Sequence, residues 1–133
     1  MMTMTTCLAD SSAWIDFIRQ PSSALRDFVE NNSAGHTEAV AMELLSGTSS
    51  ARDSLEVERL LLRSPLLAFD STSDFTAATQ LRRTALRRRL RVGIVDCMIL
   101  AVAARHGVPL LTRDRAQAEL ATSVGLRAEL IGS

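Results

Sequence analysis

The sequence predicts an α/β fold, a sandwich of helices around a small and mostly parallel sheet. Short apolar runs of strand length alternate with amphipathic segments of helix length, which is typical of this class. One segment, 94–106, is apolar on nearly every side and is expected to be the central buried helix. The chain has 133 residues, 47% of them hydrophobic, which is enough for one core and too few for two typical domains. We therefore expect residues 1–133 to form a single domain.

In the first half of the chain, we expect a strand that turns directly into a helix, followed by further helices. In order, these are a strand at 4–9, a helix from 11 to the break at Pro21, a helix around 25–29, a weak strand near His36, and helices at 38–45 and 50–63. Gly47 follows the helix at 38–45, where a glycine often takes the left-handed conformation. Ser64 and Pro65 end the helix at 50–63.

The second half is expected to alternate between strands and helices throughout. In order, the elements are a buried strand at 66–69, a helix at 74–86, the buried helix at 94–106, a strand at 108–112, a helix at 115–123 and a last short strand at 127–131. Turn and capping residues at 70–74 precede the first of these helices. Gly107 and Pro109 end the buried helix.

Composition and cysteine placement indicate a protein of the reducing cytoplasm. Acidic and basic residues balance at 15 each, and every basic residue is an arginine. Cys7 and Cys97 lie inside apolar stretches, so we expect core residues rather than a disulfide or half of a zinc site. The N-terminus has no signal-like apolar region, and the longest uninterrupted apolar run, 97–104, is far short of a membrane span. We therefore expect a soluble, cytoplasmic protein without membrane association.

Four carboxylates lie within or directly against apolar runs: Asp10, Glu43, Asp96 and Asp114. A lone carboxylate in such surroundings loses hydration, which is costly unless a positive charge compensates it. Asp10 and Asp114 stand at the carboxyl ends of predicted strands, where the functional crevice of an open α/β sheet lies. Two carboxylates about 4 Å apart repel by roughly 4 kcal/mol at an effective dielectric constant of about 20. If the four side chains converge, a divalent cation is the simplest partner.

Oxygen ligands without an accompanying cluster of Cys or His favour Mg²⁺ or Mn²⁺. Such ions activate water and stabilise the charge on a phosphate, so phosphodiester hydrolysis is the natural interpretation. Each acid also has a purely structural interpretation. These are a helix cap for Asp10, attraction to the positive end of a helix for Asp96, a solvated helix position for Glu43 and a salt-bridged turn for Asp114.

An arginine-rich segment leads into Asp96. Residues 82–91 include six arginines, and no acidic residue lies between Asp74 and Asp96. Such a block repels itself unless anions are near, so we expect a track for the phosphate backbone of a nucleic acid. Charge runs also occur as solvated helix faces or as interfaces for acidic protein segments. The residues of this track that we expect to bind the nucleic acid include Arg87, Arg88, Arg89 and Arg91.

The four acids lie in four motifs, which are LADSSAWI at 8–15, AMELLSG at 41–47, VGIVDCMILA at 92–101 and LLTRD at 110–114. In order, spacing and chain length, these motifs resemble the PIN-domain ribonucleases, and specifically the small single-domain toxins of VapBC-type toxin–antitoxin pairs. Each motif alone has little specificity, whereas four in one order have much more. The resemblance extends over essentially the whole chain.

The resemblance implies a PIN-like three-layer α/β/α sandwich and an endoribonuclease toxin that depends on Mg²⁺ or Mn²⁺. It implies that a metal-activated water attacks the phosphodiester, and that the catalytic and metal-binding residues are Asp10, Glu43, Asp96 and Asp114. Ser12 and Thr112 match polar positions beside the acids and would support the site. Family members typically form homodimers and are neutralised by a cognate antitoxin, whose C-terminal segment lies over the toxin's groove. The expected partners are therefore an RNA substrate, an antitoxin and a second copy of the chain.

The chain departs from the family's pattern after the fourth acid. Many relatives carry another acid two residues later, followed by an aromatic residue, whereas this chain has Ala116 and Gln117. A second metal ion would therefore lose a possible ligand. Two alternatives to the toxin stay open, a PIN-type nuclease with a housekeeping role in RNA processing and a catalytically silent module that binds RNA or protein.

Overall fold

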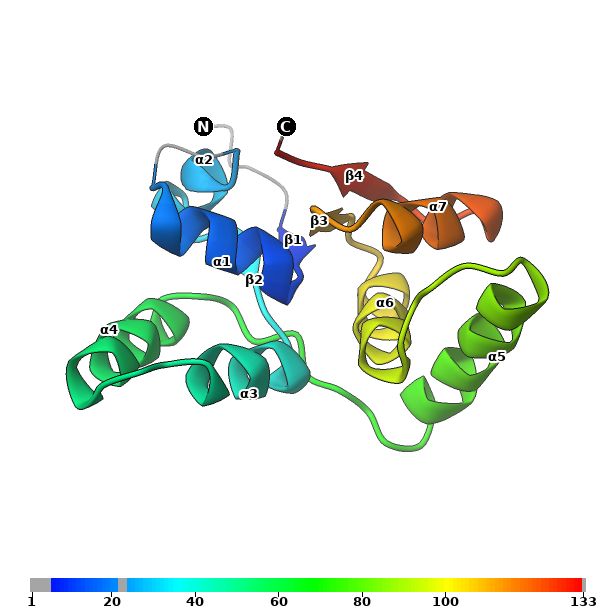
Figure 1. The fold of residues 1–133 in the computed structure, drawn as a ribbon, viewed down its shortest axis with the longest axis horizontal. Coiled ribbons are helices and arrows are strands. Elements are labelled where there is room, and N and C mark those ends of the chain that lie inside the picture. Colours follow the sequence, from blue (N-terminus) through cyan, green and yellow to red (C-terminus); the bar gives the residue numbers. More distant parts are fainter. Residues whose placement is uncertain (1–5, 22–23, 133) are drawn as a thin grey trace.

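The computed structural model describes residues 6–21 and 24–132 and has the predicted α/β architecture (Figure 1). Its helices have bounds closely similar to those expected from the sequence. The elements are β1 (Cys7–Ala9), α1 (Ser11–Arg19), α2 (Arg26–Glu30), β2 (Ala34–Gly35), α3 (Glu38–Ser46), α4 (Ala51–Leu62), α5 (Asp74–Arg87), α6 (Ile94–His106), β3 (Leu110–Thr112), α7 (Arg115–Ser123) and β4 (Ala128–Leu130). The first two residues of the strand expected at 4–9 lie outside the described part of the chain.

The strands form one parallel sheet in the order β2-β1-β3-β4. Leu8 of β1 lies opposite Gly35 of β2 on one side and Leu110 of β3 on the other. The residues of β1 and β3 are almost completely buried, as expected for strands that are covered on both faces. Because all pairs are parallel, the carboxyl ends of the strands meet at one edge of the sheet.

Helices from the two halves of the chain lie in different halves of the molecule (Figure 1). In this view α1 to α4 lie to the left and α5 to α7 to the right, and α1 packs against both β1 and β3. Helix α6 packs along α5, and its residues Ile99, Leu100 and Val102 are fully buried. The prediction that 94–106 is the central buried helix is therefore confirmed.

A left-handed glycine ends α6 but not α3. Gly107 has a φ of +67°, a conformation that side chains with a Cβ rarely adopt. Gly47, which was expected in this conformation, has a φ of −88°, so that expectation is wrong. The N–H of Gly47 instead donates to the carbonyl of Glu43 at 3.2 Å, in continuation of the helical pattern.

The buried strand expected at 66–69 does not form. Leu66 makes one isolated parallel bridge with His36, and it is 55% exposed. Beyond it, the amide of Phe69 donates to Oε1 of Glu38 at 2.8 Å. A backbone group that is paired with a side chain is not available to a strand ladder, so the segment continues as a loop. The weak strand expected near His36 is present just before that residue, as β2.

Burial agrees with the expectations drawn from composition. Cys7 and Cys97 are buried and free, as predicted for core residues. Burial raises the pKa of the Cys7 thiol to about 12, which keeps it protonated. No helix in the described part of the chain is long and apolar enough to cross a membrane.

An ion pair joins Asp74, the first residue of α5, to Arg105 of the central helix α6. The Asp74 side chain is only 1% exposed, and Nε of Arg105 donates to its two carboxylate oxygens at 3.0 and 3.1 Å. Arg105 also donates to the carbonyl of Ala68 in the loop before α5. Burial acts to raise the pKa of Asp74, but hydrogen bonds from Arg105 and from the backbone of Asp70, together with the charge of Arg105, hold it below its usual value.

We expect Arg105→Gln to lower the free energy of unfolding by about 2 kcal/mol, because Asp74 would stay buried without its cation. This is less than the usual cost of breaking a buried pair, since the Arg105 side chain is 36% exposed. The pKa of Asp74 is lowered in the folded state, so the stabilisation exists above its ordinary pKa of about 3.9 and is lost as the pH falls through the folded value. Chemical denaturation at several pH values between about 3 and 7 measures both the loss of stability in the variant and its pH dependence.

The matched control is Arg52→Gln, which removes an arginine from an exposed pair. Arg52 lies 3.6 Å from Glu56, and the two side chains are 88% and 62% exposed. Its loss should change the free energy of unfolding by less than about 0.5 kcal/mol. Equal losses in the two variants would contradict the stabilising role of the Asp74 pair.

Candidate active site and metal centre

Two of the four acids lie where β1 and β3 end. Asp10 directly follows β1, and Asp114 comes two residues after the last residue of β3. Both residues cap helices: Oδ1 of Asp10 accepts from the amide of Ala13 at 3.0 Å, and Oδ1 of Asp114 accepts from the amide of Ala116 at 2.9 Å. The capping role considered for Asp10 is therefore real. Asp114 is also a cap, rather than a member of the salt bridge considered for it.

Asp10 is the most deeply buried of the acids, at 3% exposure. The Ser12 hydroxyl donates to its Oδ1 at 2.6 Å, and the Thr112 hydroxyl donates to its Oδ2 at 2.5 Å. Burial raises the pKa of Asp10, and these hydrogen bonds oppose that shift. Thr112 also accepts from the amide of Asp114 at 2.9 Å, so one hydroxyl contacts both strand-end acids. Ser12 and Thr112 thus lie directly against the acids.

Asp96 lies in the first turn of α6 and is half-buried. Its pKa is raised to about 6, first by burial and then by the negative charges of Asp10, Asp114 and Glu43. A pKa shift of this kind requires that the other carboxylates lie near enough for their charges to act on Asp96. Asp10, Asp114 and Glu43 therefore lie within electrostatic range of Asp96, and Asp10 and Asp114 do so from the carboxyl edge of the sheet.

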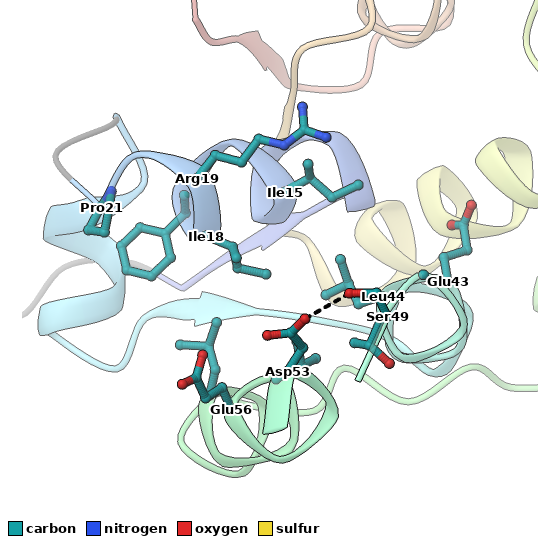
Figure 2. A pocket seen from close by; sticks show the side chains of 14 residues that line it. Ile15, Ile18, Arg19, Pro21, Glu43, Leu44, Ser49, Asp53 and Glu56 are labelled. Atoms are coloured by element: carbon teal, nitrogen blue, oxygen red, sulfur yellow. Dashed lines mark hydrogen bonds between the residues drawn. The ribbon is translucent and has the colours of Figure 1, made fainter. Parts of the chain in front are cut away.

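Glu43 differs from the others because it is exposed to solvent. Its neighbours in sequence are apolar, but Met42 and Glu43 lie on the outer side of α3 while Val40 and Leu44 are buried, so the solvated helix position considered for Glu43 is confirmed. Figure 2 shows Glu43 projecting from α3 on the side of α6. Its Oε1 accepts from the Ser11 hydroxyl at 2.7 Å, which links it to the first residue of α1.

The oxygen donors of this region fit a hard divalent cation. Among the described residues, no arginine forms an ion pair with any of the four acids, so no ion pair of this part of the chain compensates their charge. In the same part of the chain, no three carboxylate, imidazole or thiol groups are close enough to hold one ion directly. The charges of the acids still raise the pKa of Asp96, because charges act on each other over longer distances than metal–ligand bonds. Mg²⁺ also keeps several water ligands, which can span the remaining gaps.

Two polar residues at the site were not among the residues predicted from the sequence. Ser11 donates to Glu43, and Gln117 is completely buried beneath the strand-end acids. The signal for Gln117 was its position three residues after the cap Asp114, a spacing typical of a capping box. Nothing in the sequence indicated that Ser11 would contact Glu43, because the two lie 32 residues apart.

The arginine-rich segment covers the C-terminal part of α5 and the turn into α6. Arg82 is half-buried and donates to the carbonyl of Val92 at 2.8 Å, so it holds that turn. The other arginines of the segment are exposed: Arg83, Arg87, Arg88, Arg89 and Arg91. No acidic side chain of the described residues forms an ion pair with them. Their charge is available to an external anion.

A pocket of about 470 Å³ lies between α1, α3 and α4 (Figure 2). Its wall is largely apolar and includes Ile15, Ile18 and Leu60. Glu43 lines the end of it that Figure 2 shows near α6, and Asp53 and Glu56 line it from α4. The pocket therefore combines an apolar wall with an excess of negative charge.

Comparison with known proteins identifies the family. Residues 7–122 match the family model of the PIN domain. VapC ribonuclease Mb1587 from Mycobacterium bovis and ribonuclease VapC11 from Mycobacterium tuberculosis are each 36% identical to this chain over 114 residues, which cover 80% of this chain and 85% of the relative.

Solved structures agree with this assignment. The structure of DNA-bound VapBC from Salmonella typhimurium has a TM-score of 0.79 at 26% identity, covering 95% of this chain and 98% of the matched one. VapBC-1 from nontypeable Haemophilus influenzae has a TM-score of 0.74 over the same shares of the two chains, and at 14% identity it shows the fold alone. The chain therefore belongs to the PIN-domain family and, within it, to the VapC ribonucleases.

Proposed function

We propose that this protein is a metal-dependent endoribonuclease that acts as the toxin of a toxin–antitoxin pair. The observation that carries the proposal is the placement of Asp10 and Asp114 at the edge where the parallel strands β1 and β3 end, within electrostatic range of Asp96 in the first turn of α6. The 36% identity of this chain to a VapC ribonuclease supports RNA as the substrate. A VapBC complex among its structural relatives supports an antitoxin partner.

Asp10, Glu43, Asp96 and Asp114 are the residues that would hold Mg²⁺ or Mn²⁺. When bound, the ion supplies charge neutralisation for the phosphate and activation of water for in-line displacement. The chain's own hydroxyls do the positioning. Ser12 and Thr112 hold the two oxygens of Asp10, and Ser11 holds Glu43 against α1. These contacts fix the acids before the substrate arrives, which reduces reorganisation during the reaction.

The exposed arginines of the segment 82–91 would bind the phosphate backbone of the RNA beside the acids. The segment leads through Gly93 into α6, whose first turn carries Asp96. Arg87, Arg88, Arg89 and Arg91 are exposed and form no ion pair with an acidic side chain of the described residues. A substrate held there would lie next to the acidic edge of the sheet.

The pocket between α1, α3 and α4 would receive the antitoxin. Its apolar wall and its acids, Glu43, Asp53 and Glu56, suit an amphipathic segment that carries basic residues. Because Glu43 belongs to both the pocket and the acidic site, such a segment would also reach the site that it inhibits. The homodimer and the cytoplasmic location expected from the sequence stay predictions for this chain.

We expect Asp96→Asn to reduce RNA cleavage by about 100-fold or more, because it removes a charged metal ligand. Without metal, the same variant should melt at a higher temperature at neutral pH. Because the pKa of Asp96 is raised in the folded state, the free energy of unfolding falls as the pH rises from the ordinary pKa of an aspartate towards 6. Asparagine does not ionise, so the variant does not lose this stability. Mn²⁺ should raise the melting temperature of the wild type above about pH 6, and it should do so much less for the variant.

The control for this experiment is Asp27→Asn, which removes an exposed acid on α2. It should leave cleavage and the metal-dependent melting shift unchanged. Absence of any shift in the wild type at millimolar Mg²⁺ or Mn²⁺, with no cleavage of cellular RNA, would exclude the nuclease. RNA cleavage without growth inhibition on expression would favour a housekeeping nuclease over a toxin.

Charge reversal of Arg87, Arg88 and Arg89 to glutamate should weaken RNA binding and flatten its salt dependence. Each lost phosphate contact lowers the slope of log K against log salt by about 0.7 for a single strand. Filter binding at several salt concentrations measures both quantities. Reversal of Arg52, Arg59 and Arg63, which are exposed around α4, makes the same change in net charge and should have a smaller effect. If both triple variants weakened RNA binding equally, net charge alone would explain the effect, and the arginines of 82–91 would have no special role.

Ile18→Asp should break the complex with the antitoxin while leaving RNA cleavage intact. Ile18 lines the pocket and is 43% exposed, so a charge there is tolerated by the fold but opposes an apolar ligand. Co-purification with the product of a small reading frame encoded next to this one measures binding. Leu62→Asp is the control, because Leu62 is 86% exposed and does not line the pocket. An intact complex in Ile18→Asp would place the antitoxin elsewhere.

A further inference from the structure

A completely buried amide lies beneath the acidic site and has no part in the function proposed above. Gln117 is 0% exposed, although it lies only three residues after the helix cap Asp114. A buried amide that is not hydrogen-bonded destabilises a fold, so its partners matter. Both ends of this side chain contact residues next to metal-site acids.

The contacts of the amide connect two separate parts of the site. Nε2 of Gln117 donates to the backbone carbonyl of Asp96 at 3.2 Å, and Oε1 lies 3.1 Å from the Thr112 hydroxyl. The Asp96 carbonyl can only accept a hydrogen bond, so the NH₂ group must face it and the amide oxygen must face Thr112. The Thr112 hydroxyl has a single proton, so Oε1 of Gln117 and Oδ2 of Asp10, which is 2.5 Å away, share one donor.

The direction of the Gln117 side chain follows from how the start of α7 is capped. In a capping box, a glutamine at this position reaches back to the amide of the cap residue. Here the amide of Asp114 donates to the Thr112 hydroxyl at 2.9 Å. The local partner of Gln117 is therefore already satisfied, and its side chain is turned towards α6 instead. Its own backbone amide lies 3.3 Å from Oδ1 of Asp114.

We propose that Gln117 is a positioning residue that fixes the distances between Asp10, Asp96 and Asp114 and so sets the affinity of the site for a divalent cation. The inference rests on the proposed metal-dependent function. Gln117 joins the end of β3, the start of α7 and the first turn of α6, which are the elements that carry these acids. Polar partners that hold metal ligands in place typically change metal affinity by about 10- to 100-fold when they are removed.

An apolar replacement separates this role from folding. Without Gln117, the Thr112 hydroxyl keeps Asp10 as its acceptor, and the carbonyl of Asp96 keeps the helical amide four residues further along α6. Leucine is close to glutamine in size and leaves neither group without a partner, so Gln117→Leu is expected to fold. The tie between α6 and the strand-end acids is then the main thing lost.

The test is calorimetric titration of the full chain with Mn²⁺ in the absence of RNA. Gln117→Leu should bind Mn²⁺ about tenfold more weakly than the wild type. The control Leu120→Val alters another fully buried residue of α7, one turn further on, and should leave the affinity unchanged. In RNA cleavage, the Mn²⁺ concentration for half-maximal rate should rise by the same factor in Gln117→Leu, while the rate at saturating Mn²⁺ stays close to that of the wild type.

The outcomes distinguish this inference from the function on which it rests. Equal Mn²⁺ affinity in the wild type and in Gln117→Leu would overturn the positioning role while leaving the metal site intact. A wild type that binds no Mn²⁺ would overturn both. If Gln117→Leu does not fold, Gln117→Met serves in its place, because it keeps an unbranched side chain of similar length without the amide; unchanged affinity in that variant would equally overturn the inference.

Discussion

The parallel pairing of β1 with β3 is the constraint on which the site depends. Ala9 lies opposite Leu111, so both strands end at the same edge, and in each case the chain then enters a helix. The residue before a helix is favoured as aspartate because its carboxylate accepts from free amide groups at the helix start. The preference that selects Asp10 and Asp114 as caps therefore also brings two negative charges to one edge. Capping and metal binding are compatible roles for the same side chain, because a carboxylate can accept more than one interaction.

Among the described residues, hydroxyl and backbone N–H groups, rather than cations, donate to the carboxylates of Asp10 and Asp114. Ser12 and Thr112 donate to Asp10, and hydrogen bonds of this kind stabilise a carboxylate without neutralising its charge. An arginine is present next to Asp114 in sequence, but the guanidinium of Arg113 pairs with Asp16 of α1 at 2.9 Å. An arginine bound among the acids would occupy the place of a metal ion. Because no ion pair of the described residues involves these acids, repulsion between them adds to burial in raising the pKa of Asp96.

The sequence was a good guide wherever local rules determine the structure, and a poor one wherever distant residues meet. The bounds of the helices follow from apolar periodicity and capping residues, and the placement of Asp10 and Asp114 follows from strands that end in caps. The strand expected at 66–69 failed because Glu38, about 30 residues earlier in the chain, satisfies the amide of Phe69. The sequence left open whether Glu43 is buried or solvated, because only the fold determines that Val40 and Leu44, and not Glu43, face the core. The inward turn of Gln117 was equally unpredictable, since it depends on Thr112 taking the amide of Asp114.

After Asp114, this chain differs from the family's pattern in two ways: it lacks an acid at position 116, and it has an internally hydrogen-bonded glutamine at position 117. The resemblance to PIN-domain ribonucleases implies that many relatives carry an acid at the position of Ala116 and an aromatic residue at that of Gln117. With alanine at 116, the edge of the sheet carries one negative charge fewer, so the acids repel each other less and attract a cation less strongly. Both the number of charged ligands and the rigidity of a site determine its affinity for a hard cation. A buried amide that ties the first turn of α6 to Thr112 adds rigidity where charge has been lost, which gives the two differences a common physical rationale.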